Sequence, residues 1–149
     1  MERQLVIFDL ANEHYGVDIA AVESIIKLQP ITAIPRAPDF VEGVINLRGN
    51  VLPVIDLRQR FQMERGEPTK ETRIIVAEVE GLTIGMVVDA VSEVLRVPED
   101  AIQPPPPAVA AGDSAYITGI AKVNQRLITL LDLGRLHSAE EVQQELVAA

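Results

Sequence analysis

The sequence predicts an all-β protein built from two small barrels that pack side by side. Its apolar segments are short and separated by frequent turn residues, and no long helical pattern occurs before the C-terminal residues, as is typical of an all-β chain. The same order of segments also occurs twice. Antiparallel hairpins in a unit this small usually close into a barrel, because closure removes exposed strand edges. We therefore expect one barrel from each copy.

The internal repeat consists of three segments that return in the same order. Leu5–Phe8 matches Ile74–Ala77, Gly16–Ile26 matches Gly85–Leu95, and Gly43–Leu57 matches Gly119–Leu133. Two copies are too few for a stacked solenoid, and each unit is too small to bury a core alone. The 149 residues are expected to form a single domain, 1–149, with barrels at 5–61 and 73–137 and a C-terminal helix at 138–149. This prediction allows one barrel to borrow strands across the junction.

In the first copy, strands are expected where apolar and β-branched residues run between turn signals. They lie at 5–10, 15–19 and 41–47, with a helical turn leading into a strand over 20–27 and a short helix over 56–61. Pro30, Pro35 and Pro38 exclude a long helix between them. Arg48–Asn50 is a turn signal between two apolar runs and predicts a hairpin over 44–55.

The second copy follows a polar linker, 62–72, and repeats the plan. Its strands are expected at 73–78, 83–88 and 91–97, and a second hairpin at 116–123 and 127–131. Between them lies a rigid proline run, Pro104–Pro107, which we interpret as a crossover rather than as a peptide ligand. Ser138 and Glu141 form a capping box that predicts the terminal helix.

Composition and charge exclude several classes of function. The net charge of −9 disfavours nucleic acid as a partner, because its phosphates would be repelled. No apolar stretch is long enough to span a bilayer, and the N-terminus has no secretory signal. The absence of cysteine excludes disulfides and thiol chemistry and fits a reducing, cytoplasmic location.

The sequence contains no convincing catalytic, cofactor or metal site. The two histidines, His14 and His137, lack partners at ligand or acid–base spacing, and we interpret them as surface or capping residues. No serine lies in a nucleophile elbow, and no glycine loop is arranged to hold a phosphate. Asp56 and Asp132 are equivalent in the two copies, and we expect them to cap short helices rather than to form a catalytic pair.

One difference between the copies points to a functional residue. The apolar positions of Gly43–Asn50 and Gly119–Arg126 agree, but only the first copy has an arginine followed by a glycine at the hairpin tip, Arg48 and Gly49. Glycine permits a positive φ in a tight turn. The neighbouring guanidinium is then able to bind a carboxylate or a backbone carbonyl. The alternative is an arginine that only solvates the turn.

The segment 43–58, GVINLRGNVLPVIDLR, resembles the signature of the CheW family, the coupling proteins of bacterial chemotaxis arrays. The resemblance covers almost the whole chain in order. Its further matching segments are 15–19, 21–25, 34–38, 85–89 with 91–92, and 116–119. The NLRG and PVIDLR motifs are the most specific part.

The resemblance implies two SH3-like five-stranded barrels and a non-enzymatic adaptor without a cofactor. Members of this family link the cytoplasmic tip of a chemoreceptor to the regulatory domain of the histidine kinase CheA, with no direct membrane insertion. By motif position, receptor binding carries over to Arg48, Asn46, Gly49, Val22 and Ile19. Kinase binding carries over to Glu23, Ile25 and Val51.

Some alternatives stay open. The same fold would also suit an adaptor of a type IV pilus or gliding-motility pathway, or a CheW-like part of a larger protein. Arg48 either faces the receptor or braces the barrel junction by binding backbone carbonyls. Two positions depart from the family pattern. Glu42 stands where lysine or arginine is common, and where glutamate is common the chain has Ser24, with its glutamate one residue earlier, Glu23. This shift changes the charge expected at the kinase contact.

Overall fold

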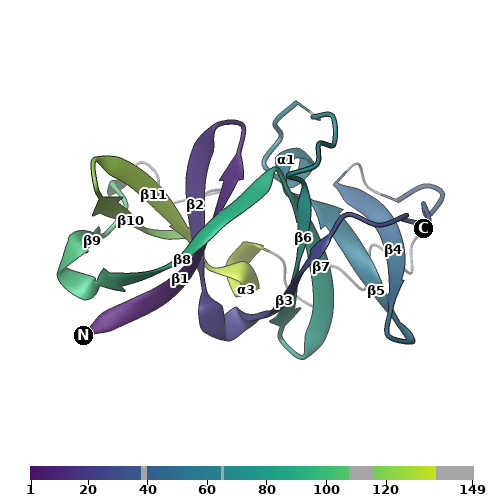
Figure 1. Cartoon of the computed structure of the whole chain (residues 1–149), viewed down its shortest axis with the longest axis horizontal. Helices are drawn as coiled ribbons and strands as arrows, with labels where there is room; N and C mark the ends of the chain where they lie inside the picture. Colours follow the sequence, from purple (N-terminus) through teal and green to yellow (C-terminus); the bar gives the residue numbers. More distant parts are fainter. Residues whose placement is uncertain (38–39, 65, 108–115, 137–149) are drawn as a thin grey trace.

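The computed structural model describes residues 1–37, 40–64, 66–107 and 116–136. Its strands form two sheets, here called sheet A and sheet B, which lie side by side (Figure 1). Sheet A has the order β8 (Ala90–Pro98), β1 (Glu2–Leu10), β2 (Glu13–Asp18), β11 (Arg126–Leu131), β10 (Ile117–Val123) and β9 (Ile102–Gln103). Sheet B has the order β3 (Val22–Lys27), β6 (Arg73–Val79), β7 (Leu82–Val88), β5 (Asn50–Asp56) and β4 (Val41–Leu47). The short helices are η1 (Ile19–Ala21), α1 (Leu57–Arg60), η2 (Glu99–Ala101) and α3 (Leu133–Leu136).

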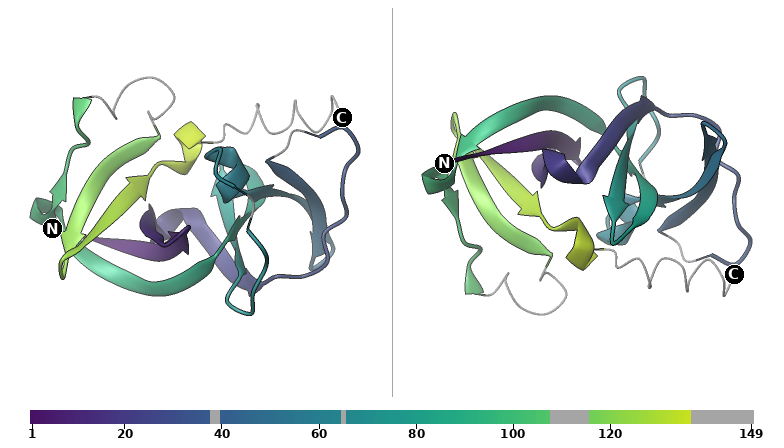
Figure 2. Two further views of the ribbon diagram at one scale, coloured as in Figure 1. Left: turned by 90° about the horizontal axis from the view of Figure 1, so that it is seen from above. Right: turned by 90° about the horizontal axis from the view of Figure 1, so that it is seen from below.

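Each sheet is rolled into a barrel, as the views from above and below show (Figure 2). Barrel A is formed by sheet A, and barrel B by sheet B. In sheet B, the chain that leaves β3 crosses to the far edge, where Thr32 and Val44 of β4 exchange two backbone hydrogen bonds of 2.9 Å. In sheet A, the chain that leaves β8 passes through η2 into β9, which pairs with β10. The predicted all-β class is confirmed. Sheet A has six strands rather than five, because the two-residue β9 takes part in its closure.

The two sequence copies exchange strands between the barrels. Sheet A takes β1 and β2 from the first copy and β8 to β11 from the second, whereas sheet B takes β3 to β5 from the first and β6 and β7 from the second. The units 5–61 and 73–137 are therefore not the two barrels, and the exchange is larger than the borrowing expected for one barrel. Because the copies are alike, a strand from either one suits the same place in a sheet, and the connections decide the pairing.

The connection that carries the first copy from sheet A into sheet B is η1. It joins β2 directly to β3 through three residues. Asp18 caps it, since its side chain accepts a hydrogen bond of 2.9 Å from the backbone N–H of Ala20. A capped single turn at the end of β2 redirects the chain out of sheet A before it can form a further strand there.

Alternation along the strands builds three apolar cores. Leu5 and Ile7 of β1 pack inside barrel A, whereas Val6 and Phe8 pack in a cluster between the barrels, here called the inter-barrel cluster. Strand β6 alternates in the same way between the core of barrel B and the inter-barrel cluster. Successive residues of a strand face opposite sides. The central runs Leu5–Phe8 of β1 and Ile74–Ala77 of β6 are apolar at every position because both of their faces are buried. The inter-barrel cluster is the largest core among the described residues.

All five aromatic residues of the sequence lie in or against the inter-barrel cluster. Four of them form a row. Phe8 stacks on Tyr15 at 5.8 Å between ring centroids, Phe61 lies 5.8 Å from Tyr15, and Tyr116 stacks on Phe61 at 5.2 Å. Phe40 packs against the same cluster. Aromatic pairs at these distances add about 0.5–1.5 kcal/mol each beyond their buried area, so they help to fix how the barrels meet.

Two of the repeated glycines mark the places where the barrels close. A Cβ atom at Gly43 would lie 2.0 Å from the carbonyl oxygen of Thr32. A Cβ atom at Gly119 would lie 3.0 Å from the Ile102 side chain and 3.2 Å from the carbonyl oxygen of Gln103. Gly43 also has a φ of 145°, which residues with a side chain rarely adopt. The repeat of these glycines in the sequence therefore reflects two equivalent closure points.

The predicted helix caps at Asp56 and Asp132 are confirmed. The Oδ1 atom of Asp56 accepts a hydrogen bond of 3.0 Å from the backbone N–H of Arg58, at the start of α1. The Oδ1 atom of Asp132 accepts one of 2.9 Å from the backbone N–H of Gly134, in α3. The expected terminal helix, 138–149, with its capping box, lies outside the described residues.

Candidate functional site

The β4–β5 hairpin ends in a two-residue turn formed by Arg48 and Gly49. Leu47 pairs with Asn50, and the two residues between them have φ angles of 55° and 86°. Positive φ at both central positions is the geometry of a type I′ turn, whose twist matches that of the flanking strands. The positive φ predicted for Gly49 is confirmed. Arg48 shares this conformation although it carries a side chain.

The side chain of Arg48 is exposed and uncommitted. Within the part of the chain that the structure describes, it makes no hydrogen bond or ion pair. It stands at the hairpin tip and takes no part in the inter-barrel cluster. The interpretation in which Arg48 braces the barrel junction is therefore wrong. Its planar guanidinium is free to bind a carboxylate or carbonyl of a partner.

A hollow of about 530 Å³, here called the tip hollow, opens at the end of barrel B beside this turn. All five strands of sheet B contribute to it. Its lining includes Arg48 beside β4, Val51 of β5, Thr83 of β7, Val76 of β6, and Glu23 and Ser24 of β3. The structure thus brings Arg48, assigned to receptor binding by resemblance, next to Glu23 and Val51, assigned to kinase binding. A residue assigned to the receptor and residues assigned to the kinase therefore line the same hollow.

The other predicted residues differ in how far they reach the surface. Ile25 points outward from β3 with 39% of its surface exposed, and Ile19 in η1 is 37% exposed. Val22 faces inward and packs against the inter-barrel cluster, so it is partly hidden from any partner. The Asn46 side chain is turned along the hairpin, where its Oδ1 atom lies 3.0 Å from the backbone N of Gly49.

Barrel A carries an exposed apolar pair that matches the one in barrel B. Val51 is 68% exposed, and Leu127, at the equivalent position of the second copy, is 62% exposed. Ile25 has its equivalent in Val94, which is 50% exposed. The internal repeat aligns the pair in barrel A with the pair in barrel B, so the sequence contained a signal for it. A comparison of the two hairpin tips alone does not reveal this pair.

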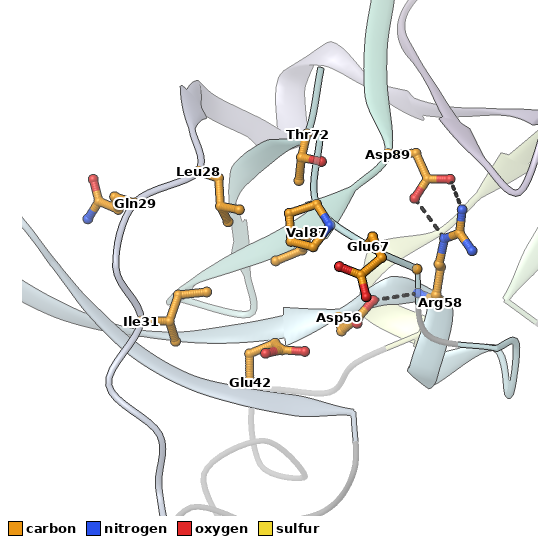
Figure 3. A pocket seen from close by; sticks show the side chains of 12 residues that line it. Leu28, Gln29, Ile31, Glu42, Asp56, Arg58, Glu67, Thr72, Val87 and Asp89 are labelled. Carbon is orange, nitrogen blue, oxygen red and sulfur yellow. Dashed lines mark hydrogen bonds and ion pairs between the residues drawn. The ribbon is translucent and has the colours of Figure 1, made fainter. Parts of the chain in front are cut away.

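A second hollow, here called the junction pocket, has a volume of about 300 Å³ and opens at the other end of barrel B (Figure 3). Leu28, Ile31 and Val87 give it an apolar side, and carboxylates such as Asp56 and Glu67 give it a polar one. Asp56 already accepts the capping hydrogen bond of α1. Much of the polar lining is therefore engaged in holding the fold.

Arg58 and Asp89 join the two sequence copies at the edge of the junction pocket (Figure 3). The Nε and Nη2 atoms of Arg58 donate hydrogen bonds to the two carboxylate oxygens of Asp89, with 2.8 Å from Nε to Oδ1. The backbone N–H of Ala11 donates to the same carboxylate at 2.8 Å. Partial burial raises the pKa of Asp89, but the hydrogen bonds from Arg58 and Ala11 and the charge of Arg58 outweigh it and hold the pKa below its ordinary value.

Arg58 thus supplies the bracing that one interpretation of the sequence gave to Arg48. This pair was not predicted from the sequence, although each residue ends a segment that matches the family signature: Arg58 ends PVIDLR, and Asp89 ends the segment 85–89. The signal was present in the sequence as two opposite charges at motif ends. Only the exchange of strands places them together.

We expect Asp89→Asn to lower the free energy of unfolding by about 1–2 kcal/mol near neutral pH, because Arg58 then loses a charged two-point partner. The folded-state pKa of Asp89 is lowered, so its contribution is fully present above the ordinary Asp pKa of about 4 and is lost as the pH falls through the lower folded value. Urea unfolding of both proteins at pH 7 and in acid tests this. Equal stability at pH 7 would contradict it.

No group of three or more His, Cys, Asp or Glu side chains is arranged to hold a metal ion in the part of the chain that the structure describes. No helix in the described ranges is long and apolar enough to cross a membrane.

Comparisons with known proteins match this chain over nearly its whole length. The chemotaxis protein CheW of Klebsiella aerogenes is 37% identical over 140 residues, which are 94% of this chain and 84% of that protein. The probable chemotaxis protein CheW of Rhizobium etli is 39% identical over 140 residues, 94% of this chain and 90% of that protein.

A solved structure and a family model agree with these relatives. The crystal structure of the scaffolding protein TtCheW from Thermoanaerobacter tengcongensis superposes with a TM-score of 0.85 at 43% identity and covers 95% of this chain and 96% of that one. The predicted pair of SH3-like barrels agrees with this match. The model of the CheW-like domain matches residues 4–141. The chain therefore belongs to the CheW-like domain family.

Proposed function

We propose that this protein is a non-enzymatic adaptor of bacterial chemotaxis, which couples the cytoplasmic tip of chemoreceptors to a histidine kinase of the CheA type. The names of its relatives support a scaffold role in chemotaxis. The observation that carries the proposal is the uncommitted guanidinium of Arg48, held on the rim of the tip hollow beside the exposed Val51. The alternative, an adaptor of a pilus or gliding-motility pathway, gains no support from a particular residue.

The tip hollow suits a protein partner. Small protein interfaces depend on a few apolar or arginine anchors surrounded by less important contacts. Val51 and Ile25 provide exposed apolar surface, and Arg48 provides five donors in a planar fork. In this proposal Arg48 contacts the receptor, while Glu23, Ile25 and Val51 contact the kinase. The two partners would then meet at adjacent parts of one end of barrel B.

Arg48→Ala is expected to weaken receptor binding and receptor-dependent kinase activation. Arg48→Lys should also weaken both, because an ammonium does not reproduce the planar fork, but to a smaller extent because it keeps the positive charge. The melting temperature should change little, since an exposed arginine contributes about 0.5 kcal/mol or less. The measurements are binding to a receptor tip, kinase activation and thermal unfolding. Arg96→Ala, which removes an exposed arginine of barrel A, is the matched control. Unchanged receptor binding in Arg48→Ala would contradict the assignment.

Ile25→Asp and Val51→Asp are each expected to weaken kinase binding by roughly 2 kcal/mol or more, because the complex would bury an unpaired charge. Both side chains are exposed in the free protein, so the variants should fold normally. Val51→Thr keeps the size of the side chain without adding a charge and should lose much less affinity. Calorimetric titration with the kinase regulatory domain measures the effect. Normal affinity in both aspartate variants would show that this surface is not the kinase site.

A further inference from the structure

Asn46 makes a hydrogen bond inside the hairpin that carries Arg48. Its Oδ1 atom accepts a hydrogen bond of 3.0 Å from the backbone N–H of Gly49. Its own carbonyl oxygen accepts a hydrogen bond of 3.4 Å from Nε2 of Gln29, in the segment that follows β3. The Asn46 side chain is thus engaged with the turn that follows it along β4.

The turn needs such support because Arg48 occupies the left-handed region, with φ at 55°. A residue with a Cβ atom is disfavoured there by about fivefold or more. Asparagine and aspartate tolerate this region because their short side chains bind the local backbone. Arginine has no such short polar group. The hydrogen bond from Gly49 to Asn46 therefore supplies, from two residues upstream, the local contact that Arg48 lacks.

The β10–β11 hairpin, which corresponds to β4–β5 in the second sequence copy, is an internal control. Its turn residues, Asn124 and Gln125, also have positive φ, 50° and 67°. The residue that corresponds to Arg48 there is Asn124, which tolerates the left-handed region by itself. The residue that corresponds to Asn46 is Lys122, which has no acceptor to offer. Of these two equivalent hairpins, only the one with arginine at the first turn position has the amide before it. The β6–β7 turn differs from both, since Glu80 has a φ of 51° and the residue two places before it is Glu78.

We propose that Asn46 is a positioning residue, which holds Arg48 in the left-handed turn and so sets the direction of its guanidinium, rather than a residue that contacts the receptor. This inference rests on the proposed receptor-facing role of Arg48. It changes the role that resemblance gave to Asn46 and explains how one exposed arginine presents a fixed geometry. A flexible tip would spread the same guanidinium over many directions and weaken binding.

The test is a double-mutant cycle between Asn46 and Arg48, read by affinity for a receptor tip. Asn46→Leu removes the acceptor and is expected to weaken binding about three- to tenfold, the range for one lost hydrogen bond. Asn46→Asp keeps an oxygen in the same place and should restore most of the affinity. In the Arg48→Ala background, Asn46→Leu should cause no further loss. Lys122→Leu in the second hairpin is the control and should have no effect.

A readout that needs no partner separates the two possible failures. The three-bond coupling between the amide and α protons of residue 48 reports its φ angle, and it should change in Asn46→Leu and recover in Asn46→Asp. An unchanged coupling overturns the positioning step itself. Additive losses in the double-mutant cycle also overturn it, because Asn46 would then contact the receptor directly. If Arg48→Ala leaves receptor affinity unchanged, the proposed receptor contact fails instead, and the functional part of this inference fails with it.

Discussion

A Gly43→Ala variant is expected to lose the closure of barrel B, with a loss of about 4 kcal/mol or more in the free energy of unfolding. The added Cβ would lie 2.0 Å from the carbonyl oxygen of Thr32, and a backbone atom cannot swing aside as a side chain does. Relief requires breaking the two hydrogen bonds between Thr32 and Val44. The φ of 145° at this glycine adds strain for any other residue. Soluble yield and urea unfolding followed by circular dichroism measure the effect.

Gly49→Ala is the matched control. Gly49 also has a positive φ, but nothing lies within 4 Å of the place where its Cβ would be. Its substitution should therefore cost about 1 kcal/mol, the price of the left-handed conformation alone. If the two variants lose similar stability, steric closure at Gly43 is not the reason for its presence.

Phe8→Ala is expected to destabilise both barrels together by about 3–5 kcal/mol. Phe8 is fully buried in the inter-barrel cluster and stacks on Tyr15, so its removal leaves a cavity between the barrels. Because each barrel contains strands of both copies, neither is expected to remain folded when the other unfolds. Circular dichroism should show a single transition at lower denaturant concentration, for the variant as for the parent.

Val94→Ala is the control for this prediction, since Val94 is half exposed in barrel A and should change stability by no more than about 0.5 kcal/mol. Two well-separated transitions in Phe8→Ala, one of them unchanged from the parent, would contradict the prediction. They would mean that one barrel folds without the support of the inter-barrel cluster.

Features that depend on neighbours in the sequence could be predicted from the sequence. Asp56 and Asp132 cap helices because a carboxylate two residues before an unpaired N–H has a local partner. Gly49 adopts positive φ because the distance between two apolar runs leaves only a tight turn. Strands β1 and β6 could be predicted because each contains a run of four apolar residues, 5–8 and 74–77, although the burial of these runs on both faces became clear only in the fold.

Features that depend on which copy supplies a strand could not be predicted. The copies are so similar that pairing within a copy and pairing between copies look alike in sequence. The short connections from β2 through η1 to β3 and from β7 to β8, which pass from one sheet to the other, carry no distinct signal. The contact between Arg58 and Asp89 follows from that exchange. So does the tip hollow, in which Val76 and Thr83 of the second copy stand beside Arg48 of the first. Resemblance named Arg48, Glu23 and Val51 but did not show that they share one surface.

The exchange of strands has the form of a domain-swapped dimer whose two protomers are joined into one chain. In a swapped dimer, each protomer lends strands to its partner and neither is complete alone, so folding depends on protein concentration. The segment between α1 and β6 converts that encounter into an event within one molecule, at an effective concentration in the millimolar range for a short linker. This protein therefore keeps two interlaced barrels at any dilution. Its two copies are also free to differ, as Arg48 and Asn124 do at their hairpin tips, which a symmetric dimer of identical chains does not allow.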